Sequence, residues 1–456
     1  MFTSEFEIPR RIQIDFGAIV CGLLLLLLGS VTAHAASGGK TGVTIIYTGN
    51  LDGELEPCGC SLEGDFGGIR RQATLIDRLR RERPNLFFIS SGGLLRSESV
   101  HDRLTGEYIL KGAAKLRYDA IGVQWPDLAY GMNFIKKDAL PWVASNWPDI
   151  FHGERRVTRG GKILAFFNWI DPGASPLQQM GGMHGMTAPQ ADTAMLAETL
   201  QRAKAEGALT VLASTLGADE ARALLPLQHV DVLLIRSAYE KYGEPKMLDH
   251  TLVLQPGSRG QRFGRLDVVL DGAGAIESWK HRVITMPNTV PDAPRMRSWY
   301  REYNARVKAD YKKGVKIAKA RQAGQSPYAG ALACQSCHAG QHKIWNASRH
   351  AHAYDKLRRV NKAFDPNCIV CHTVGFNKPG GFIDDDSTAS LANVQCESCH
   401  GAAREHAETG GAKPVGNAGW PRERMCAQCH VPAHSPSFNV DVYWPKIMHS
   451  VGAGDK

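Results

Sequence analysis

Between residues 37 and 294, short apolar segments alternate with longer stretches in which apolar residues recur at helical spacing. The apolar segments have the length and the β-branched or aromatic content of buried strands: VTIIYTGN, NLFFISSGG, KILAFFNWI, ALTVLAS and VDVLLIRS. The stretches GGIRRQATLIDRLRRE and TAMLAETLQRAKAE have the spacing of amphipathic helices. This alternation predicts an α/β domain over residues 36–294.

The pattern changes after residue 294. The charged stretch RSWYREYNARVKADYKKGVKIAKARQ has helical periodicity, and GQSPYAG at 324–330 has the composition of a linker. We therefore expect a helical connector and linker over residues 295–329. Residues 330–456 follow the linker as a second domain.

The amino-terminal residues have the pattern of an export signal. Arg10 and Arg11 precede an apolar run over residues 16–31, and Ala33-His34-Ala35 follows it. The run is shorter than the roughly 20 residues of a spanning helix, so it predicts a signal peptide over 1–35 and an exported chain. An uncleaved anchor is the alternative. Cleavage would leave no stable membrane span, and we expect a periplasmic protein, with the outer surface and the extracellular space as alternatives.

Cysteine spacing supplies the strongest chemical signal. Of eleven cysteines, eight lie after residue 330, in four Cys-x-x-Cys-His motifs that we number 1 to 4. They are Cys334, Cys337 and His338; Cys368, Cys371 and His372; Cys396, Cys399 and His400; and Cys426, Cys429 and His430. In this spacing two thiols bond to one porphyrin while the adjacent imidazole binds its iron. Zinc sites or disulfides would not produce so uniform a pattern. We expect four covalently bound c-type haems with the four histidines as proximal ligands. Four haems leave little room for an ordinary hydrophobic core in residues 330–456, so we expect a mostly α, haem-packed domain of short helices and loops.

Each haem iron has a sixth coordination position. A second imidazole there gives an iron that only exchanges electrons, whereas an open position binds small molecules. Six histidines of this region lie outside the motifs: His342, His350, His352, His406, His434 and His449. Their number suffices for four distal ligands, but the count alone assigns none of them.

Residues 330–450 resemble the cytochrome c-554 type of bacterial tetrahaem cytochrome in four segments: CQSCHAGQHKIWNASRHAHAYDKL, NCIVCHTVGF, VQCESCHGAAREH and MCAQCHVPAHSPSFNVDVYWPKIMH. The resemblance implies distal ligands at His350, which ends a Trp-x-x-Ser-x-His segment, and at His406, soon after motif 3. His352 and His449 complete the distal candidates, and His342 and His434 are weaker ones. The family has one haem without a strong sixth ligand, so the resemblance also implies that an open iron can occur here.

The first domain resembles the periplasmic 5'-nucleotidase branch of calcineurin-like metallophosphatases in YTGNLDGEL, GGIRRQATLIDRLR, FISSGG, TLGADEARALL, VDVLLIRSAY and LQPGSRGQRFGRLDVVLD. This implies a layered α/β/β/α architecture. A two-metal phosphatase needs carboxylate and histidine ligands, and each family position is altered here. The replacements are Asn50-Leu51-Asp52, Gly92-Gly93, Val123-Gln124, Thr215 and Arg236-Ser237-Ala238-Tyr239. Only Asn50 and Asp52 could still contact a cation, and two weak oxygen ligands do not make a two-metal site, so we expect no phosphatase activity.

The loop after the first predicted strand contains a Cys-Gly-Cys sequence, with Cys58 and Cys60. Such a pair closes a strained ring when it is oxidised, and strained disulfides are easily reduced. Cys58 and Cys60 are therefore candidate catalytic thiols that exchange electrons with the haems. A static disulfide, or two thiols that hold an adventitious metal, is the alternative, and the sequence favours neither.

Taken together, these patterns favour an electron-transfer protein. The formal charge is +9, but the sequence contains no motif that binds a groove of DNA or RNA. An exported chain also meets little nucleic acid, so we expect no nucleic-acid partner. The expected partners are other redox proteins or cytochromes that donate and accept electrons, with the α/β domain as scaffold or docking module. The alternative is an oxidoreductase. It would act on a small nitrogen or sulfur compound at an open haem iron, or as a haem-coupled thiol/disulfide reductase through Cys58 and Cys60.

Overall fold

The computed structural model describes residues 42–57, 65–99, 101–176, 188–236, 243–271, 274–322, 324–431, 434–435 and 437–449. The expected signal peptide and the pair Cys58 and Cys60 lie outside these ranges. Within them, no helix combines the length and the apolar character needed to cross a membrane.

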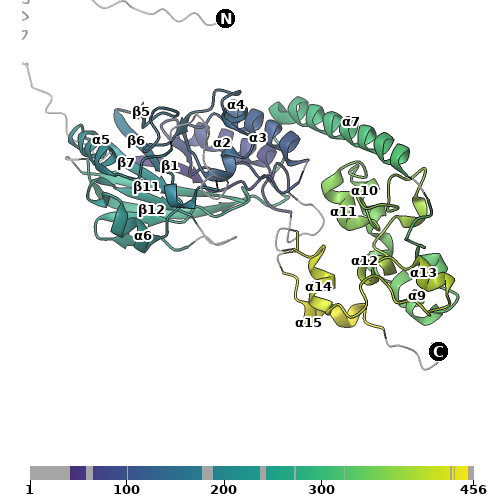
Figure 1. The fold of residues 1–456 in the computed structure, drawn as a ribbon. Helices are drawn as coiled ribbons and strands as arrows, with labels where there is room; N and C mark the ends of the chain where they lie inside the picture. The colour runs from purple at the N-terminus through teal and green to yellow at the C-terminus, as the bar shows by residue number, and fades with distance from the viewer. Residues whose placement is uncertain are drawn as a thin grey trace, which may run out of the picture. The chain divides into compact units, whose positions relative to one another are not determined.

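Two six-stranded sheets form the centre of the α/β region, which we define as residues 42–294 (Figure 1). The first has the order β12-β11-β1-β2-β3-β4, with strands Ile276–Thr285, Arg262–Leu270, Gly42–Thr48, Phe87–Ser90, Ala120–Gly122 and Trp142–Val143. The second has the order β5-β6-β7-β8-β10-β9, with strands Arg155–Arg159, Lys162–Trp169, Leu209–Ser214, Val232–Ile235, Thr251–Leu254 and Lys246–Leu248. The five strands predicted from the sequence are confirmed as β1, β2, β6, β7 and β8.

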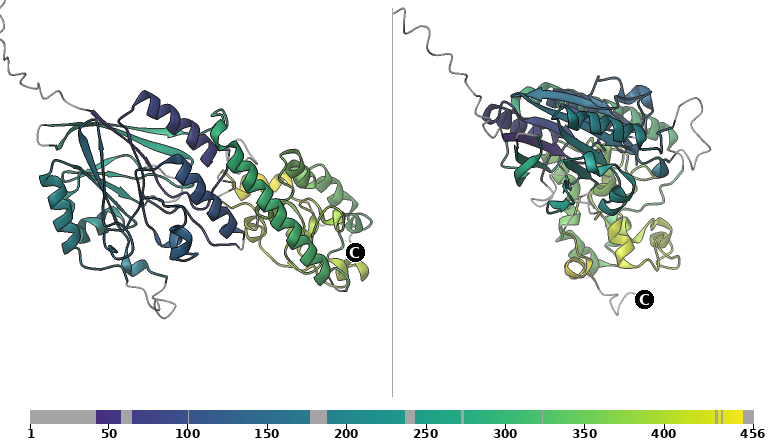
Figure 2. Two further views of the ribbon diagram at one scale, coloured as in Figure 1. Left: turned by 90° about the horizontal axis from the view of Figure 1, so that it is seen from above. Right: turned by 90° about the vertical axis from the view of Figure 1, so that its left-hand side faces the viewer.

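Helices cover the outer faces of both sheets (Figure 2). The longer ones are α2 (Ile69–Glu82), α3 (Asp102–Leu116), α5 (Ala194–Ala205) and α6 (Ala218–Leu224). The shorter elements are α4 (Met132–Ile135), η1 (Trp125–Leu128), η2 (Pro172–Ala174), η3 (Leu227–His229) and η4 (Pro294–Met296). The predicted helices over 67–82 and 193–206 are confirmed as α2 and α5.

Alternation along the strands separates the layers. Ile45 of β1 and Phe87 of β2 point into a buried cluster between the two sheets. Their neighbours Ile46 and Phe88 point into an outer cluster with α2 and α3, because successive side chains of a strand face opposite sides. Phe167 of β6 faces the other outer cluster, with α5 and α6. The result is the α/β/β/α architecture expected from the sequence.

Parallel pairing sets the geometry of one edge of the first sheet. Strand β1 is parallel to β2, with Thr48 opposite Ser90, and β2 is parallel to β3, with Ser90 opposite Ile121. The loops that follow parallel strands emerge at the same edge. Asn50, Gly93 and Gln124 are therefore brought together, although they come from three separate loops.

Helix α7 (Arg297–Arg321) is the connector that the sequence predicts. Trp299, Tyr303 and Val307 on its first half are buried in the outer cluster with α2 and α3. Tyr311, further along, also packs against a cluster of the carboxyl-terminal region, which we define as residues 330–449. One helix thus contributes side chains to clusters of both parts of the chain.

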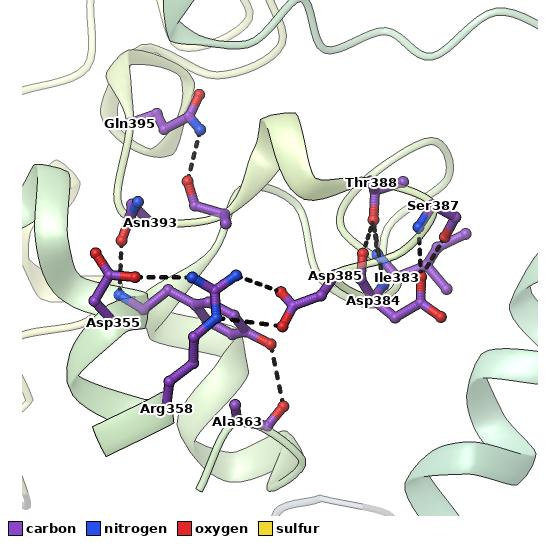
Figure 3. A network of polar contacts seen from close by, with 12 residues as sticks. Asp355, Arg358, Ala363, Ile383, Asp384, Asp385, Ser387, Thr388, Asn393 and Gln395 are labelled. Carbon is purple, nitrogen blue, oxygen red and sulfur yellow. Dashed lines mark hydrogen bonds and ion pairs between the residues drawn. The ribbon is translucent and has the colours of Figure 1, made fainter. Parts of the chain in front are cut away.

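The carboxyl-terminal region consists of short helices and loops, as predicted. They are α8 (Ala331–Cys334), α9 (Ala339–Asn346), η5 (Arg349–His352), α10 (Ala353–Arg359), α11 (Pro366–His372), η6 (Ala389–Leu391), α12 (Cys396–His400), α13 (Arg404–Glu408), α14 (Arg422–Ala427), α15 (Val440–Tyr443) and η7 (Trp444–Lys446). A small buried cluster includes Tyr354, Leu357, Ile369 and Phe382. Polar contacts hold the loop after motif 2 in place. Arg358 lies between Asp355, at 2.8 Å, and Asp385, at 3.0 Å (Figure 3).

Candidate haem sites

The four motifs lie on or at the ends of short helices. Motif 1 begins at the last residue of α8, motif 2 ends α11, motif 3 is α12, and motif 4 begins in the last turn of α14. None of the eight motif cysteines is in a disulfide. Thiols of different motifs meet in two places: Cys334 contacts Cys396, and Cys371 contacts Cys429. The fold therefore brings motif 1 next to motif 3, and motif 2 next to motif 4.

Three histidines of the motifs face a second imidazole. The ring centroids lie 6.2 Å apart for His338 and His406, 5.9 Å apart for His400 and His449, and 6.1 Å apart for His430 and His350. Two imidazoles that bind one iron from opposite sides hold their centroids roughly 6 Å apart, since each metal–nitrogen bond is about 2 Å long. The donor set and its spacing therefore fit three six-coordinate haems.

Hydrogen bonds set the tautomer of several of these imidazoles. Nδ1 of His372 lies 2.7 Å from the carbonyl oxygen of Ala353. Nδ1 of His406 lies 2.7 Å from that of Lys413, and Nδ1 of His449 lies 3.1 Å from that of Ile447. A carbonyl only accepts, so Nδ1 carries the proton and Nε2 keeps its lone pair for a metal.

Burial favours the neutral imidazole, which is the form that binds metal. It lowers the pKa of His350, His400 and His430 below the ordinary histidine value, and neighbouring imidazoles lower that of His350 and His400 further. Neutral rings with a free nitrogen are the ligands that a haem iron takes.

His372 of motif 2 is placed differently from the other three proximal candidates. Its ring is fixed by the Ala353 carbonyl, but no ring contact in the described part of the chain joins it to a second imidazole. His350 lies within electrostatic reach of His372, yet its ring pairs with His430. Among the residues that the structure describes, motif 2 therefore has a proximal candidate without a paired distal one.

The remaining histidine candidates occupy other positions. His352 is exposed at the end of η5, and within the described ranges its ring contacts no histidine of a motif, so its role as a ligand stays a prediction. The ring of His342, on α9, packs 5.1 Å from that of Trp345. His434 lies in the turn after motif 4, where its backbone amide donates to Val431.

Exposed apolar side chains accumulate around the motifs. Of the thirteen exposed large apolar side chains among the described residues, seven lie after residue 330: Leu332, Ile344, Val360, Val370, Val442, Tyr443 and Met448. Val370 lies inside motif 2, and Leu332 precedes motif 1 by two residues. A porphyrin is a large apolar surface that such side chains can cover, so these residues also fit the group that the cysteine motifs imply.

Trp345 and Ser348 of the Trp-x-x-Ser-x-His segment position His350. In the Trp-x-x-Ser-x-His segment, Nε1 of Trp345 donates to the Val394 carbonyl at 2.7 Å. The Val394 amide in turn donates to the His350 carbonyl at 3.2 Å, and Ser348 accepts from the His350 amide. This explains the spacing of the segment, because Trp345 and His350 are tied to the same residue.

Glu397 was missed by the sequence analysis. It is the second residue of motif 3, and its side chain is buried. Its carboxylate accepts hydrogen bonds from the backbone amides of Ala329, Gly330 and Ala403 at 2.8 to 2.9 Å, which ties the start of motif 1 to motif 3. The only available signal was a charged residue between the two cysteines of one motif.

Similarity to known proteins covers the same region. Residues 333–401 match the family model described as "Cytochrome c554 and c-prime". Cytochrome c-554 of Nitrosomonas europaea is 29% identical over 140 residues, which cover 24% of this chain and 60% of that protein. The carboxyl-terminal region resembles cytochrome c-554. This similarity supports a c-type cytochrome with covalently bound haem, although the chain spans only about 60% of that relative's length.

Solved structures resemble the α/β region. The 5'-nucleotidase precursor of Thermus thermophilus has a TM-score of 0.51 at 17% identity, over 77% of this chain and 74% of that one. The sulfate thiohydrolase SoxB of the same organism has a TM-score of 0.50 at 17% identity, over 58% of this chain and 60% of that one. At this identity the likeness shows the fold, and the fold is the one that the sequence resemblance implied.

Side chains at the family's metal-ligand positions bind one another in this chain. Asn50 and Gln124 form a reciprocal amide pair with hydrogen bonds of 3.1 and 3.0 Å, and Nδ2 of Asn50 also donates to Asp52 at 3.2 Å. Asn50 and Gln124 are buried. In the described part of the chain, no group of three or more His, Cys, Asp or Glu side chains could hold a metal ion. The side-chain oxygen of Asn50 that could still have met a cation thus accepts from Gln124.

Proposed function

We propose that the protein is an exported tetrahaem c-type cytochrome that transfers electrons between other redox proteins. The observation that carries this proposal is the pairing of His338, His400 and His430 with second imidazoles at the spacing of two ligands on one iron. The leader-like residues 1–35 support export, and we expect the periplasm, with the outer surface and the extracellular space as alternatives. The domain boundaries that go with this proposal are 36–294, 295–329 and 330–456.

The motif residues and three further histidines have defined roles in this proposal. The eight motif cysteines hold the four haems, His338, His372, His400 and His430 are proximal ligands, and His406, His449 and His350 are distal ligands of motifs 1, 3 and 4. Bound haem supplies one-electron exchange between ferric and ferrous iron. The protein holds the imidazoles neutral and oriented, because carbonyl acceptors at Nδ1 leave Nε2 for the iron.

A haem count and an EPR spectrum test this proposal. The pyridine haemochromogen of the purified protein should give four haems per chain. The oxidised protein should show low-spin signals from three irons and one high-spin signal from the iron of motif 2. Fewer than four haems, or covalent haem missing from a motif after proteolysis, would contradict the tetrahaem assignment.

A second candidate function rests on His372. Since no second imidazole pairs with it in the described residues, its iron could accept a small nitrogen or sulfur compound, and the protein would then be an oxidoreductase. Conversion of the high-spin signal on addition of nitrite or hydroxylamine would favour this function. Four low-spin irons that ignore both compounds would exclude it and leave pure electron transfer.

The thiol version of the oxidoreductase proposal involves residues outside the described ranges. In this version, Cys58 and Cys60 exchange electrons with the haems. Cys58→Ser combined with Cys60→Ser should abolish any thiol or disulfide reductase activity and leave the response to nitrite unchanged. Retention of reductase activity would rule out these thiols.

A further inference from the structure

A buried ionic cluster lies where the α/β region, α7 and the segment before motif 2 meet. The carboxylate of Glu56 accepts hydrogen bonds from the hydroxyl of Tyr300 and the ammonium of Lys362. Nζ of Lys362 also donates to Oδ1 of Asn304 at 2.9 Å and lies 3.6 Å from Oδ2 of Asp365. Glu56 and Lys362 are 306 positions apart in the sequence.

The charge of Lys362 lies in largely buried surroundings. Its side chain is 13% exposed, that of Glu56 is 21% exposed and that of Asp365 is 6% exposed. Aromatic rings of Tyr300 and Tyr303 lie 5.5 and 5.7 Å from Nζ. Burial alone would lower the pKa of Lys362, but the charges of Glu56 and Asp365 outweigh it and raise the pKa above its ordinary value. The ammonium is therefore charged at neutral pH.

Asp365 connects this cluster to motif 2. It is the residue before α11, and its carboxylate accepts a hydrogen bond from the Asn367 amide at 3.1 Å. Its carbonyl accepts hydrogen bonds from the amides of Cys368 at 3.0 Å and Ile369 at 2.9 Å. Next to it, Phe364 is buried in the cluster that contains α2 and α3. The helix that bears Cys368, Cys371 and His372 thus begins in contact with the α/β region.

We propose that Glu56 is a positioning residue of the α/β region that sets the reduction potential of the haem at motif 2 through its ion pair with Lys362. This inference rests on the proposed tetrahaem function and gives the α/β region a role beyond scaffold or docking module. The pair carries two opposite charges whose fields largely cancel. Asp365 adds a second carboxylate beside Lys362, so loss of either Glu56 or Lys362 changes the net charge of the cluster by one unit. Such a change is screened less in largely buried surroundings than at the surface.

The sign of each effect follows from electrostatics. Reduction adds an electron to the iron, so an uncompensated positive charge favours the reduced form and an uncompensated negative charge opposes it. Glu56→Gln removes one negative charge and leaves Lys362 with Asp365 as its carboxylate partner, so it should raise the midpoint potential of the motif 2 haem. Lys362→Met removes the positive charge and leaves the carboxylates of Glu56 and Asp365, so it should lower that potential. The double variant removes both charges and should return the potential towards that of the native protein.

The experiment is a spectroelectrochemical titration of the full-length protein, with the motif 2 iron followed through its high-spin EPR signal. Opposite shifts in the two single variants, and their cancellation in the double variant, would establish the inference. Shifts of the same sign, or equal shifts at all four haems, would overturn it, because a merely structural disturbance acts in that way. Glu56→Asp keeps the charge and should leave the potential close to native even if it lowers stability.

The pair formed by Arg295 and Asp77 provides a matched control. It is also an ion pair between distant segments, with 2.6 Å between Nε and Oδ2, but it joins η4 to α2 and does not involve residues of the carboxyl-terminal region. Asp77→Asn should leave all four potentials unchanged. The haem count of each variant separates the two claims. Native haem content without shifted potentials overturns only this inference, whereas a missing motif 2 haem in the unaltered protein overturns the proposed function as well.

Discussion

The carboxylate of Asp127 accepts a hydrogen bond of 2.9 Å from the backbone amide of Gly93. It also accepts bonds from the amides of Leu94, Leu95 and Gln124 at 2.6, 3.2 and 3.0 Å. The nucleotidase family has a metal-binding aspartate where this chain has Gly93. Here a buried carboxylate organises the backbone of the same turn. The edge of the sheet that would hold cations is held together by hydrogen bonds instead.

The buried Asp127 should make stability depend on pH. Burial raises the pKa of this carboxyl to about 6, although the four amides oppose the shift. A folded-state pKa above the unfolded one means that the folded state binds the proton more tightly. The contribution of protonated Asp127 to the unfolding free energy is therefore fully present below about pH 4. This contribution is lost as the pH rises through about 6, and the total loss is about 3 kcal/mol.

Urea denaturation followed by circular dichroism at several pH values would measure this effect against Asp127→Asn, which does not titrate. The difference in unfolding free energy between native protein and variant should shrink as the pH rises from about 4 to 7. A difference that stays constant over this range would show that Asp127 is already ionised at low pH, with the amide bonds outweighing burial.

Reintroduction of the lost metal ligand should not restore a cation site. Gly93 has a φ of +69°, and a Cβ atom added there would lie 2.5 Å from Nδ2 of Asn50. Gly93→Asp should therefore lower the unfolding free energy, by roughly 1–3 kcal/mol. Nucleotide hydrolysis with added Mn²⁺ should stay at background. Hydrolysis that depends on Mn²⁺ would show that the Asn50–Gln124 pair opens to admit cations.

Loss of a distal imidazole should be visible in the spin state of one iron. His406→Ala removes the partner of His338 and should convert one low-spin EPR signal to high spin while the haem count stays at four. His250→Ala is a suitable control, because that ring contacts Leu227 within the α/β region. An unchanged set of low-spin signals would mean that another residue binds the motif 1 iron.

His352 offers a separate test of motif 2. Since its ring is exposed and contacts no motif histidine in the described residues, His352→Ala should leave the high-spin signal of the oxidised protein unchanged. If the native protein has four low-spin irons and this substitution creates a high-spin one, His352 is the distal ligand of His372. That result would remove the basis for chemistry at an open iron.

Local patterns were sufficient to predict much of this protein. The strands around Ile45, Phe87 and Phe167 are short apolar segments, and the haem motifs are contiguous in the sequence. In each case the signal lies within a few neighbouring residues, where periodicity and spacing report directly on structure. The ligand losses at Gly93 and Gln124 were also visible, because the resemblance aligned them with a known pattern.

Contacts between distant segments could not be predicted in the same way. The count of histidines did not show that His406 faces His338 or that His449 faces His400, because these pairs form only when the short helices pack. Nor did it show the mutual satisfaction of Asn50 and Gln124. The Glu56–Lys362 pair joins loops on different parts of the chain, and neither residue belongs to a recognisable motif.

Glu397 provides the last prediction, on the assembly of motifs 1 and 3. Its carboxylate accepts from three backbone amides, and its side chain is buried. Glu397→Ala would leave these amides unpaired in the interior, at a cost of about 1–3 kcal/mol each. We expect a loss of at least about 3 kcal/mol in unfolding free energy, which urea denaturation of the haem-loaded protein would measure. The low-spin signals of the motif 1 and motif 3 irons should broaden, because the two helices lose their common anchor.

Glu423→Ala is the matched control for this substitution. Glu423 lies one turn before motif 4, but its side chain is exposed and pairs with the neighbouring Arg422. Exposed ion pairs contribute little to stability, so this variant should unfold like the native protein. If Glu397→Ala is as stable as Glu423→Ala, the three amides that bind Glu397 find other partners. In that case the haems hold motifs 1 and 3 together, and this carboxylate does not.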